Sequence, residues 1–280
     1  MIIFKKADLL LNYILRNKQE GKKTGFVPTM GALHHGHLTL IDTCKKHNDI
    51  AVCSIFVNPT QFNNPDDLEN YPVTTSKDIE QLISHDCDVL FLPAVDEMYP
   101  SDLAKKFYPL GAIENRLEGH YRPGHFQGVC QAVDRLLNIV QPDNLYMGQK
   151  DFQQCMVIKT LLKITGKENV VNLVIVPTVR EADGLAMSSR NLRLNEDQRK
   201  LATSIFHELN FIKEHLHQSS FDALKNDATN HLIQKGFKVD YVEIADANDL
   251  APATNTSKNL VLLAAATTGD IRLIDNLVLN

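Results

Sequence analysis

The sequence lacks any apolar run that approaches the roughly 20 residues a membrane-spanning helix needs, so we expect no such helix. Its first 21 residues also lack a basic segment ahead of an apolar core, which argues against a secretory signal. The chain also lacks an excess of positive charge. The formal net charge of −5 gives no general attraction to nucleic acid or to an anionic membrane. Any phosphate binding must therefore be local.

Cysteine is sparse and scattered. The five cysteines, Cys44, Cys53, Cys87, Cys130 and Cys155, are odd in number and include no CxxC pair. This pattern is typical of reduced, mostly buried thiols in a cytoplasmic protein, and it does not favour a catalytic cysteine. With 44% hydrophobic and 22% charged residues, the composition is ordinary for a soluble globular protein, and 280 residues suggest one large or two modest domains.

Short apolar runs alternate with amphipathic segments through the first two-thirds of the chain. These patterns predict strands at 24–30, 50–57, 88–93, 144–148 and 169–179, and helices at 36–47, 75–87, 126–140 and 151–165. The helix at 75–87 is expected to open with a Thr75–Asp78 capping pair. Strands that alternate with helices pair in parallel, so the predicted fold class is α/β, a doubly wound, Rossmann-like parallel sheet.

The character of the sequence changes in the last third. Two amphipathic helices are predicted at 195–216 and 220–236, followed by strands at 237–247, 259–269 and 271–279. We expect these to form a smaller C-terminal α+β domain, and we place the boundary near 178–190. The predicted domains are residues 1–178 and 179–280.

Three histidines gather in FVPTMGALHHGHLTLID, where a predicted strand passes into a helix. Gly31 and Gly36 let the backbone approach a ligand, and a helix starting near Gly36 presents free N–H groups to an anion. His34 and His37 share one face of the first turn and could donate hydrogen bonds to a phosphate. A polar surface cluster and a zinc site are the alternatives. Zinc needs three or four convergent ligands, and since no partner cluster stands out, we expect no protein-bound metal.

A second polar loop, YMGQKDFQQ, follows the strand predicted at 144–148. Gly148 permits close approach of a ligand, and Lys150 offers a positive charge for phosphate. Asp151 could cap the next helix or bind magnesium through water. Gln154 lies about one helical turn after Lys150 and could face the same space. The alternative is an ordinary strand-to-helix turn with a solvated lysine.

A third loop, READGLAMSSRN, follows the strand predicted at 169–179 and lies at the expected domain junction. Ser188, Ser189 and Arg190 supply two hydroxyls and a planar guanidinium, which suit the β- and γ-phosphate oxygens of a nucleotide. Taken alone, the segment would more often be a polar loop that caps the next helix.

A fourth loop, SIFVNPTQF, carries Asn58 and Gln61 at the end of the strand predicted at 50–57. Uncharged amides at such a place suit recognition of hydroxyl and carboxylate groups in a small-molecule pocket. In an open α/β sheet, ligands bind where strand carboxyl ends meet helix N-termini. All four loops occupy such positions, so we expect them to converge on one crevice.

Six segments together resemble the pantothenate synthetase (pantoate–β-alanine ligase) family: PTMGALHHGHLTLI, SIFVNPTQF, RPGHFQGV, GQKDFQQ, VPTVREADGLAMSSRN and GDIRLIDN. They follow the family order over nearly the whole chain. HxGH alone marks the wider superfamily of HxGH nucleotidyltransferases and class I aminoacyl-tRNA synthetases. The resemblance implies an ATP-dependent ligase that condenses (R)-pantoate with β-alanine through a pantoyl adenylate. The products would be pantothenate, a coenzyme A precursor, with AMP and diphosphate.

The resemblance also implies roles for individual residues. The implied ATP site comprises Met30, Gly31, Ala32, Leu33, His34, His35, Gly36, His37, Gly148, Gln149, Lys150, Asp151, Val179, Met187, Ser188, Ser189 and Arg190. The implied catalytic set within it is His34, His37, Lys150, Ser188, Ser189 and Arg190, with His37 as proton donor. Gln61 and Gln154 match the glutamines that hold pantoate, Gln61 also lies near β-alanine, and Asn58 lines that site. Many members carry glutamate where this chain has Gln149, which leaves the role of this residue open.

The resemblance further implies ATP as a substrate with Mg²⁺, no tightly bound organic cofactor, and a homodimer in the cytoplasm. The second domain would close over the nucleotide. A pantoyl adenylate is hydrolysable, so the pocket should exclude water, and we expect the segment 63–75 to cover it. Two rival functions are left open. A sister nucleotidyltransferase of the same fold would not explain Gln61 and Gln154 in their local contexts. A non-catalytic nucleotide-binding regulator would bind ATP without releasing pyrophosphate.

Overall fold

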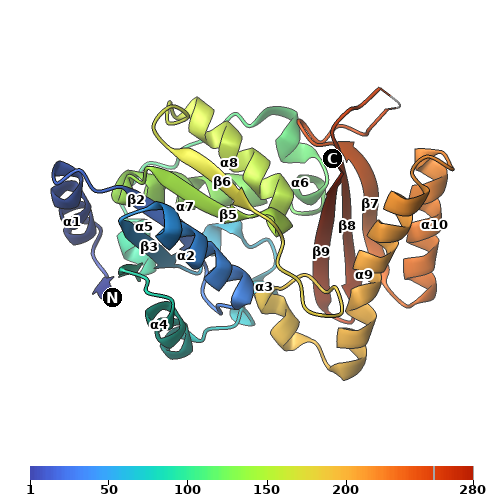
Figure 1. Ribbon diagram of the computed structural model, residues 1–280, viewed down its shortest axis with the longest axis horizontal. Helices are drawn as coiled ribbons and strands as arrows, with labels where there is room; N and C mark the ends of the chain where they lie inside the picture. Colours follow the sequence, from blue (N-terminus) through green and yellow to red (C-terminus); the bar gives the residue numbers. More distant parts are fainter. Residues whose placement is uncertain (255, 280) are drawn as a thin grey trace.

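A parallel sheet and a small antiparallel sheet organise the chain (Figure 1), of which the computed structural model describes residues 1–254 and 256–279. The parallel strands are β1 (Ile2–Phe4), β2 (Thr24–Thr29), β3 (Ile50–Ile55), β4 (Val89–Phe91), β5 (Asn144–Gly148) and β6 (Asn172–Val176). Their spatial order is β1-β4-β3-β2-β5-β6. The chain winds outward from β2 and returns beside it as β5, so the topological switch point lies between these two strands. The predicted doubly wound fold is confirmed.

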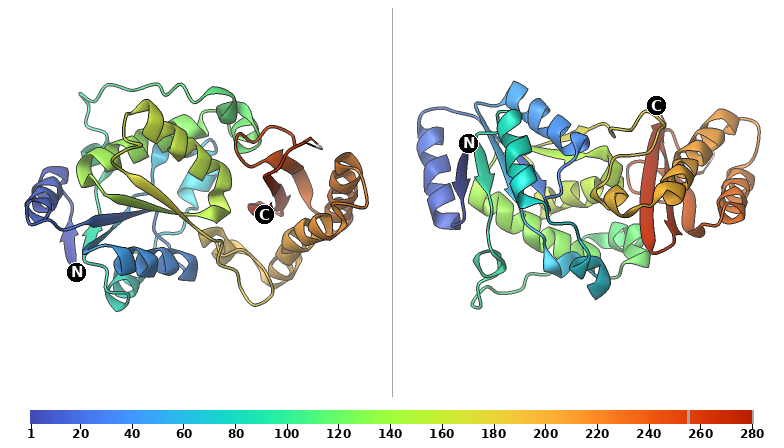
Figure 2. Two further views of the ribbon diagram at one scale, coloured as in Figure 1. Left: turned by 45° about the horizontal axis from the view of Figure 1, so that its top comes forward. Right: turned by 90° about the horizontal axis from the view of Figure 1, so that it is seen from below.

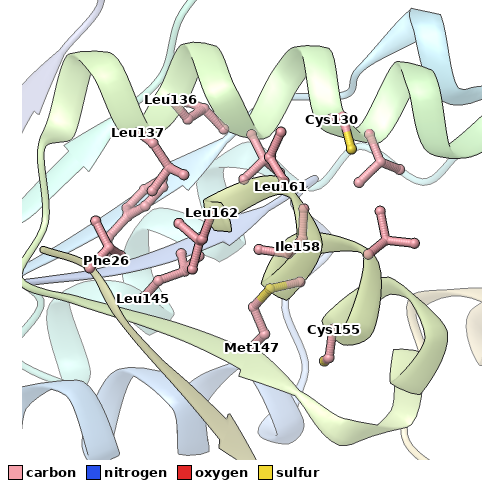
Figure 3. Packing of buried hydrophobic residues seen from close by; sticks show 14 of the residues in the cluster. Phe26, Cys130, Leu136, Leu137, Leu145, Met147, Cys155, Ile158, Leu161 and Leu162 are labelled. Atoms are coloured by element: carbon pink, nitrogen blue, oxygen red, sulfur yellow. The ribbon is translucent and has the colours of Figure 1, made fainter. Parts of the chain in front are cut away.

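Helices cover both faces of the parallel sheet. The helices α1 (Ala7–Gln19), α7 (His125–Val140) and α8 (Phe152–Ile164) pack on one face, and α2 (His35–His47) and α4 (Thr75–Ser84) on the other. Figure 3 shows the first of these cores, where Leu137 of α7 and Leu162 of α8 lie over Phe26 and Leu145 of the sheet. Strands buried on both sides explain why the sequence reads there as continuous apolar runs.

The small sheet contains β7 (Lys238–Asp246), β8 (Leu260–Thr268) and β9 (Ile271–Leu279), all antiparallel. The helices α9 (Glu196–His215) and α10 (Phe221–Gln234) pack on its outer face, against residues such as Leu262. Figure 2 shows the sheet standing between these helices and the larger part of the molecule. Leu263 of β8 joins the core of the parallel sheet, so the two parts share buried contacts.

Several features differ from the sequence-based expectation. The strand β1 and the helix α1 at the N-terminus were not predicted. The Thr75–Asp78 capping pair is wrong: Thr74 occupies the N-cap, and Asp78 is buried with its carboxylate turned toward another loop. Short helical turns not expected from periodicity are η1 (Pro59–Gln61), α3 (Pro65–Glu69), α5 (Val95–Met98), η2 (Gly111–Asn115), α6 (Glu118–Tyr121), η3 (Gln149–Asp151) and η4 (Ser189–Arg193).

All five cysteines are free and buried, as predicted. Among the helices of the described residues, none combines the length and the apolar character that crossing a membrane would require.

Candidate active site

A crevice of about 890 Å³ opens at the switch point, between the parallel sheet and the small sheet. Its volume suits a small-molecule site. The four predicted loops meet there, and the predicted site residues that line the crevice are Met30, His34, Gly36, His37, Asn58, Gln61, Gly148, Lys150, Asp151, Gln154, Val179, Met187, Ser188, Ser189 and Arg190. Five candidates do not line the crevice. Leu33 is buried in a hydrophobic core, His35 is exposed, and Gly31, Ala32 and Gln149 belong to the same loops but do not reach its wall.

The loop after β2 is held by hydrogen bonds that the sequence did not reveal. Gly31 and Ala32 have φ values of 85° and 49°, a region in which a non-glycine residue is strained. The buried carboxylate of Asp78 accepts the Ala32 and Leu33 N–H groups at 3.0 and 2.9 Å. From the other side, the Ser189 hydroxyl donates to the Ala32 carbonyl at 3.0 Å. The loop is therefore fixed from both α4 and η4.

His34 and His37 lie at the start of α2 with their ring centroids 4.0 Å apart. Gly36 makes this possible, because a Cβ there would lie 2.9 Å from Cε1 of His34. The His34 backbone N–H donates to Nδ1 of His37 at 3.3 Å. With Nδ1 as acceptor, a neutral His37 carries its proton on Nε2. Within the described residues, Nδ1 of His34 is buried without a hydrogen-bond partner.

Both imidazoles are electrically neutral near pH 7. Burial, and then the positive charge of Lys150, lowers the pKa of His37 to about 4. Burial, and then the neighbouring His37 and Lys150, lowers the pKa of His34 to about 2. An anion entering the crevice would therefore meet hydrogen-bond donors at these histidines, together with the positive N-terminus of α2.

Asn58 and Gln61 are linked to each other in the turn after β3. The Asn58 amide donates to Oε1 of Gln61 at 2.9 Å and to the Gly128 carbonyl at 3.1 Å. Its oxygen accepts from Thr60 and from the Tyr99 hydroxyl. Asn58 is 2% exposed and its hydrogen-bonding groups are occupied, so it orients Gln61 more than it meets a ligand.

His125 lies next to Gln61 and Arg122 lies next to His125, and neither was singled out from the sequence. The His125 ring is buried, and its Nδ1 lies 2.8 Å from the Gln61 carbonyl. Nη1 of Arg122 lies 3.2 Å from Nε2 of the same ring. Burial, and then the charge of Arg122, lowers the pKa of His125 to about 4. A neutral His125 therefore donates to Gln61 and accepts from Arg122. The quoted RPGHFQGV segment contained both residues, but its pattern gave no sign of what they contact.

The loop after β5 is shared between the two sheets. Nζ of Lys150 lies 3.6 Å from Asp151, whose side chain is 50% exposed. Asp151 occupies the N-cap of α8 but makes no side-chain capping bond. The buried Asn276 of β9 donates to the carbonyls of Gln149 and Lys150 at 3.0 and 2.7 Å. The Gln149 amide in turn lies 3.5 Å from Oδ1 of Asn276, so Gln149 faces β9 and the small sheet positions the Lys150 turn.

Arg190 is tied to the segment predicted to cover the site. It donates to Asp67 of α3 at 2.8 Å. Arg193 lies 3.5 Å from the same carboxylate. Burial raises the pKa of Asp67, but hydrogen bonding and attraction from Arg190 outweigh this and hold it below its ordinary value. The segment 63–75 thus reaches the phosphate-binding candidates in this structure.

A zinc site finds no support in this geometry. Throughout residues 1–254 and 256–279, no three His, Cys, Asp or Glu side chains converge as metal ligands would. His34 and His37 lie together, but no third ligand joins them.

Comparison with known proteins places this arrangement in context. A model of the pantoate-beta-alanine ligase family matches residues 2–278. The structure is similar to pantothenate synthetase from Thermus thermophilus, with a TM-score of 0.92 and 37% sequence identity over 99% of each chain. It is also similar to a Francisella tularensis pantoate-beta-alanine ligase solved with beta-gamma ATP and beta-alanine, with a TM-score of 0.83 and 39% identity over 99% of this chain and 97% of that one.

Proposed function

We propose, from the premise that this chain belongs to the pantoate-beta-alanine ligase family, that the crevice at the switch point is its active site. The enzyme condenses pantoate with β-alanine, using ATP and releasing AMP and diphosphate. The observation that carries the site assignment is the convergence of the four loops after β2, β3, β5 and β6. The product, pantothenate, is a precursor of coenzyme A.

Two chemical steps follow from the reactants. A carboxylate does not accept an amine directly, so the pantoate carboxylate first attacks the α-phosphorus of ATP, forming pantoyl adenylate and diphosphate. The amine of β-alanine then attacks the acyl carbon and displaces AMP. The first step brings two anions together, so it needs donors and positive charge where negative charge develops at phosphorus.

We assign this stabilisation to the loop after β2 and to Lys150. His37 is neutral in the free site and holds its proton on Nε2, so it donates a hydrogen bond to the phosphate and is the proton donor we propose. His34 lies against it, and the N-terminus of α2 adds its dipole. Ser188, Ser189 and Arg190 bind the β- and γ-phosphates from the opposite wall, with Ser189 also bonded to the loop.

The pantoate pocket lies at the β3 end of the crevice. Gln61 and Gln154 line the crevice there, and their amides suit the hydroxyl and carboxylate groups of pantoate. We propose that Asn58 and His125 hold Gln61 in place through its side chain and its backbone carbonyl. Gln61 also lies where β-alanine would approach the adenylate.

Mg²⁺ would enter with the ATP phosphates. Asp151 fits this ion, because its carboxylate lines the crevice, is half exposed and makes no capping bond. The ion would neutralise phosphate charge as ATP binds.

The domain division and the oligomeric state are also part of our proposal. We divide the chain into domains 1–178 and 179–280, with the second closing over ATP. After β6 the chain runs through η4, α9 and α10 into the small sheet, which supports this boundary. A homodimer in the cytoplasm stays a prediction from the family resemblance, and sedimentation equilibrium of the purified protein tests the dimer.

The decisive experiment measures pyrophosphate release from ATP with Mg²⁺ and pantoate, with and without β-alanine, and identifies AMP and pantothenate by mass. We expect sustained turnover and pantothenate only when β-alanine is present. His37→Ala should slow adenylation by about 100-fold or more, the scale of losing one donor to the transition state. Gln61→Ala should weaken pantoate binding and leave ATP affinity nearly unchanged. Folded, ATP-binding protein that releases no pyrophosphate with pantoate would overturn the proposal in favour of a sister nucleotidyltransferase or a regulator.

A further inference from the structure

Arg122 stands apart from the other arginines of the crevice. Arg190 pairs with Asp67, Arg193 with Asp67 and Asp270, and Arg272 with Glu118 and Asp240. Across the described part of the chain, no carboxylate lies within 4.0 Å of the Arg122 guanidinium, and its one hydrogen bond goes to His125.

The surroundings of Arg122 suit an anion. The side chain is partly buried in the crevice wall, and burial, then repulsion from Arg190, lowers its pKa to about 10. A cation held this way without a partner is unfavourable, and a bound carboxylate would relieve that cost. The helix α7 begins at His125, three residues further on, and its first turn contains no acidic side chain. The positive end of the helix therefore adds to the attraction.

His125 connects Arg122 to Gln61, in the part of the site where we place β-alanine. Its two ring nitrogens contact the Gln61 carbonyl at 2.8 Å and Nη1 of Arg122 at 3.2 Å. A neutral imidazole with both nitrogens occupied has one tautomer and little rotational freedom. The guanidinium is thus held at a fixed place relative to Gln61, the glutamine we place between pantoate and β-alanine.

β-Alanine carries a carboxylate that the reaction leaves untouched but the crevice must accommodate. The imidazoles of His34, His37 and His125 are neutral at pH 7 and cannot balance that charge. Three of the four crevice arginines are already paired, and Lys150 lies in the β5 loop assigned to ATP. We propose that Arg122 binds the carboxylate of β-alanine and so makes the enzyme select an acidic amine. This inference rests on the function proposed above.

The experiment compares wild type with Arg122→Met and Arg122→Lys, using β-alanine and its neutral amide, β-alaninamide, as acceptors. Pantoate-dependent exchange of labelled pyrophosphate into ATP, measured without any amine, reports the first step alone. Lys238→Met is the matched control, because Lys238 is an exposed cation at the rim of the same crevice. Circular dichroism checks that each variant is folded.

For Arg122→Met we expect the KM for β-alanine to rise roughly 30- to 100-fold, the scale of a lost charge-assisted pair, with pyrophosphate exchange within about threefold of wild type. The preference for β-alanine over β-alaninamide should fall by a similar factor. Arg122→Lys keeps the charge, so it should recover part of the affinity for β-alanine and part of the preference over β-alaninamide. If the methionine variant does not fold, the same two measurements on Arg122→Lys test the inference. Lys238→Met should change neither the KM for β-alanine nor the preference for β-alanine over β-alaninamide.

Two results would overturn the inference while leaving the proposed function intact. Loss of pyrophosphate exchange with an unchanged KM for β-alanine would assign Arg122 to the ATP phosphates, alongside Arg190. Unchanged discrimination between β-alanine and its amide would remove Arg122 from acceptor selection. A wild-type protein that forms no pantothenate would instead overturn the proposed function, and this inference with it.

Discussion

Gly36 shows how a single residue fixes the geometry of the site. It lies at the second position of α2, and its backbone has no positive φ, so the helix itself does not require glycine. The constraint comes from the side chain of His34, whose ring covers the space that a Cβ would occupy. The glycine of the HxGH motif therefore allows the two histidines to lie together.

Gly36→Ala should separate stability from activity. Alanine favours a helix over glycine by up to about 1 kcal/mol, so unfolding stability should stay equal or rise slightly. The new methyl group would lie 2.9 Å from His34 Cε1 and must displace that ring. We expect pyrophosphate exchange to fall by roughly 10- to 100-fold, as in a His34→Ala comparison variant. Full activity in Gly36→Ala would show that the position of the His34 ring does not matter.

The protonation state of His37 gives a second test at the same scale. Burial, then Lys150, lowers its pKa to about 4 in the folded protein, against roughly 6.5 in an unfolded chain. We expect NMR of ¹⁵N-histidine-labelled protein without ligands to show a neutral, Nε2-protonated His37 at pH 6, with His37→Ala identifying the signal. Because the unfolded state binds the proton first, this residue's contribution to stability is full above pH 6.5 and is lost as pH falls toward 4. An imidazolium at pH 6 would contradict this.

Individual residues were predictable only where their type was unusual for its place. Clustered histidines after a strand pointed to the crevice, and His34 and His37 line it. Arg122 and His125 lie in a segment of ordinary composition. The His125 ring contacts the carbonyl of Gln61, 64 positions away, and Arg122 contacts that ring, and local spacing reveals neither connection. Gln149 likewise acts through Asn276, which follows it by 127 positions.

At the scale of elements, α4 acts as a support for the loop after β2. Asp78 lies on its buried face with Leu82, and its two carboxylate oxygens each accept one backbone N–H of the loop. Thr74, at the end of the cover segment, donates to the same carboxylate at 2.9 Å. An acidic residue on the apolar face of a helix was the signal available in the sequence. The capping-box pattern misassigned it, because that pattern considers only neighbours along the chain.

Asp78→Asn should loosen this support. Whichever way the amide is turned, its NH₂ group faces either the Ala32 or the Leu33 N–H, and one donor loses its acceptor. We expect a loss of about 1–3 kcal/mol in unfolding free energy and faster hydrogen exchange at those two amides. Pyrophosphate exchange should slow by roughly 10-fold or more. Glu80→Gln, the same chemical change on the exposed side of α4, is the control. Unaltered exchange at Ala32 and Leu33 would rule the support out.

The periodic elements were predictable because their cores are regular. The helices α7 and α9 and the strands β5 and β8 lie close to their expected bounds. The edge strand β1 has three residues, and two of them are exposed, so it presents no buried run. The helix α1 follows directly, and the charges scattered through this segment were evidence only against a secretory signal.

At the scale of the whole molecule, β9 fastens the small sheet to both ends of the crevice. Asp275 receives two hydrogen bonds from Arg180, at 2.6 and 2.9 Å, just after the chain leaves β6. Asn276 holds the Lys150 turn. At the other end, Arg272 forms a bidentate pair with Glu118 of α6, with both distances 2.7 Å. The sequence predicted two domains, and its GDIRLIDN segment resembled the family. The sequence could not show that β9 makes all of these contacts, because they depend on how the two sheets are placed relative to each other.

The Arg272–Glu118 pair should be worth far more than a surface ion pair. The two side chains are 25% and 10% exposed, and the Tyr241 hydroxyl also donates to Glu118 at 2.8 Å. Burial raises the pKa of Glu118, but the hydrogen bond and charge of Arg272 overcome this and keep the carboxyl ionised.

Glu118→Gln would leave the partly buried guanidinium of Arg272 with Asp240 as its one remaining carboxylate partner in the described structure. We expect urea unfolding to show a loss of about 2–4 kcal/mol in unfolding free energy. Arg199→Gln, which breaks pairs with the more exposed carboxylates of Asp183 and Glu181, should cost about 1 kcal/mol or less. If the two losses are equal, the pair does not hold the sheets together. If Glu118→Gln also raises the KM for ATP while Arg199→Gln does not, the same contact orients the small domain over the nucleotide.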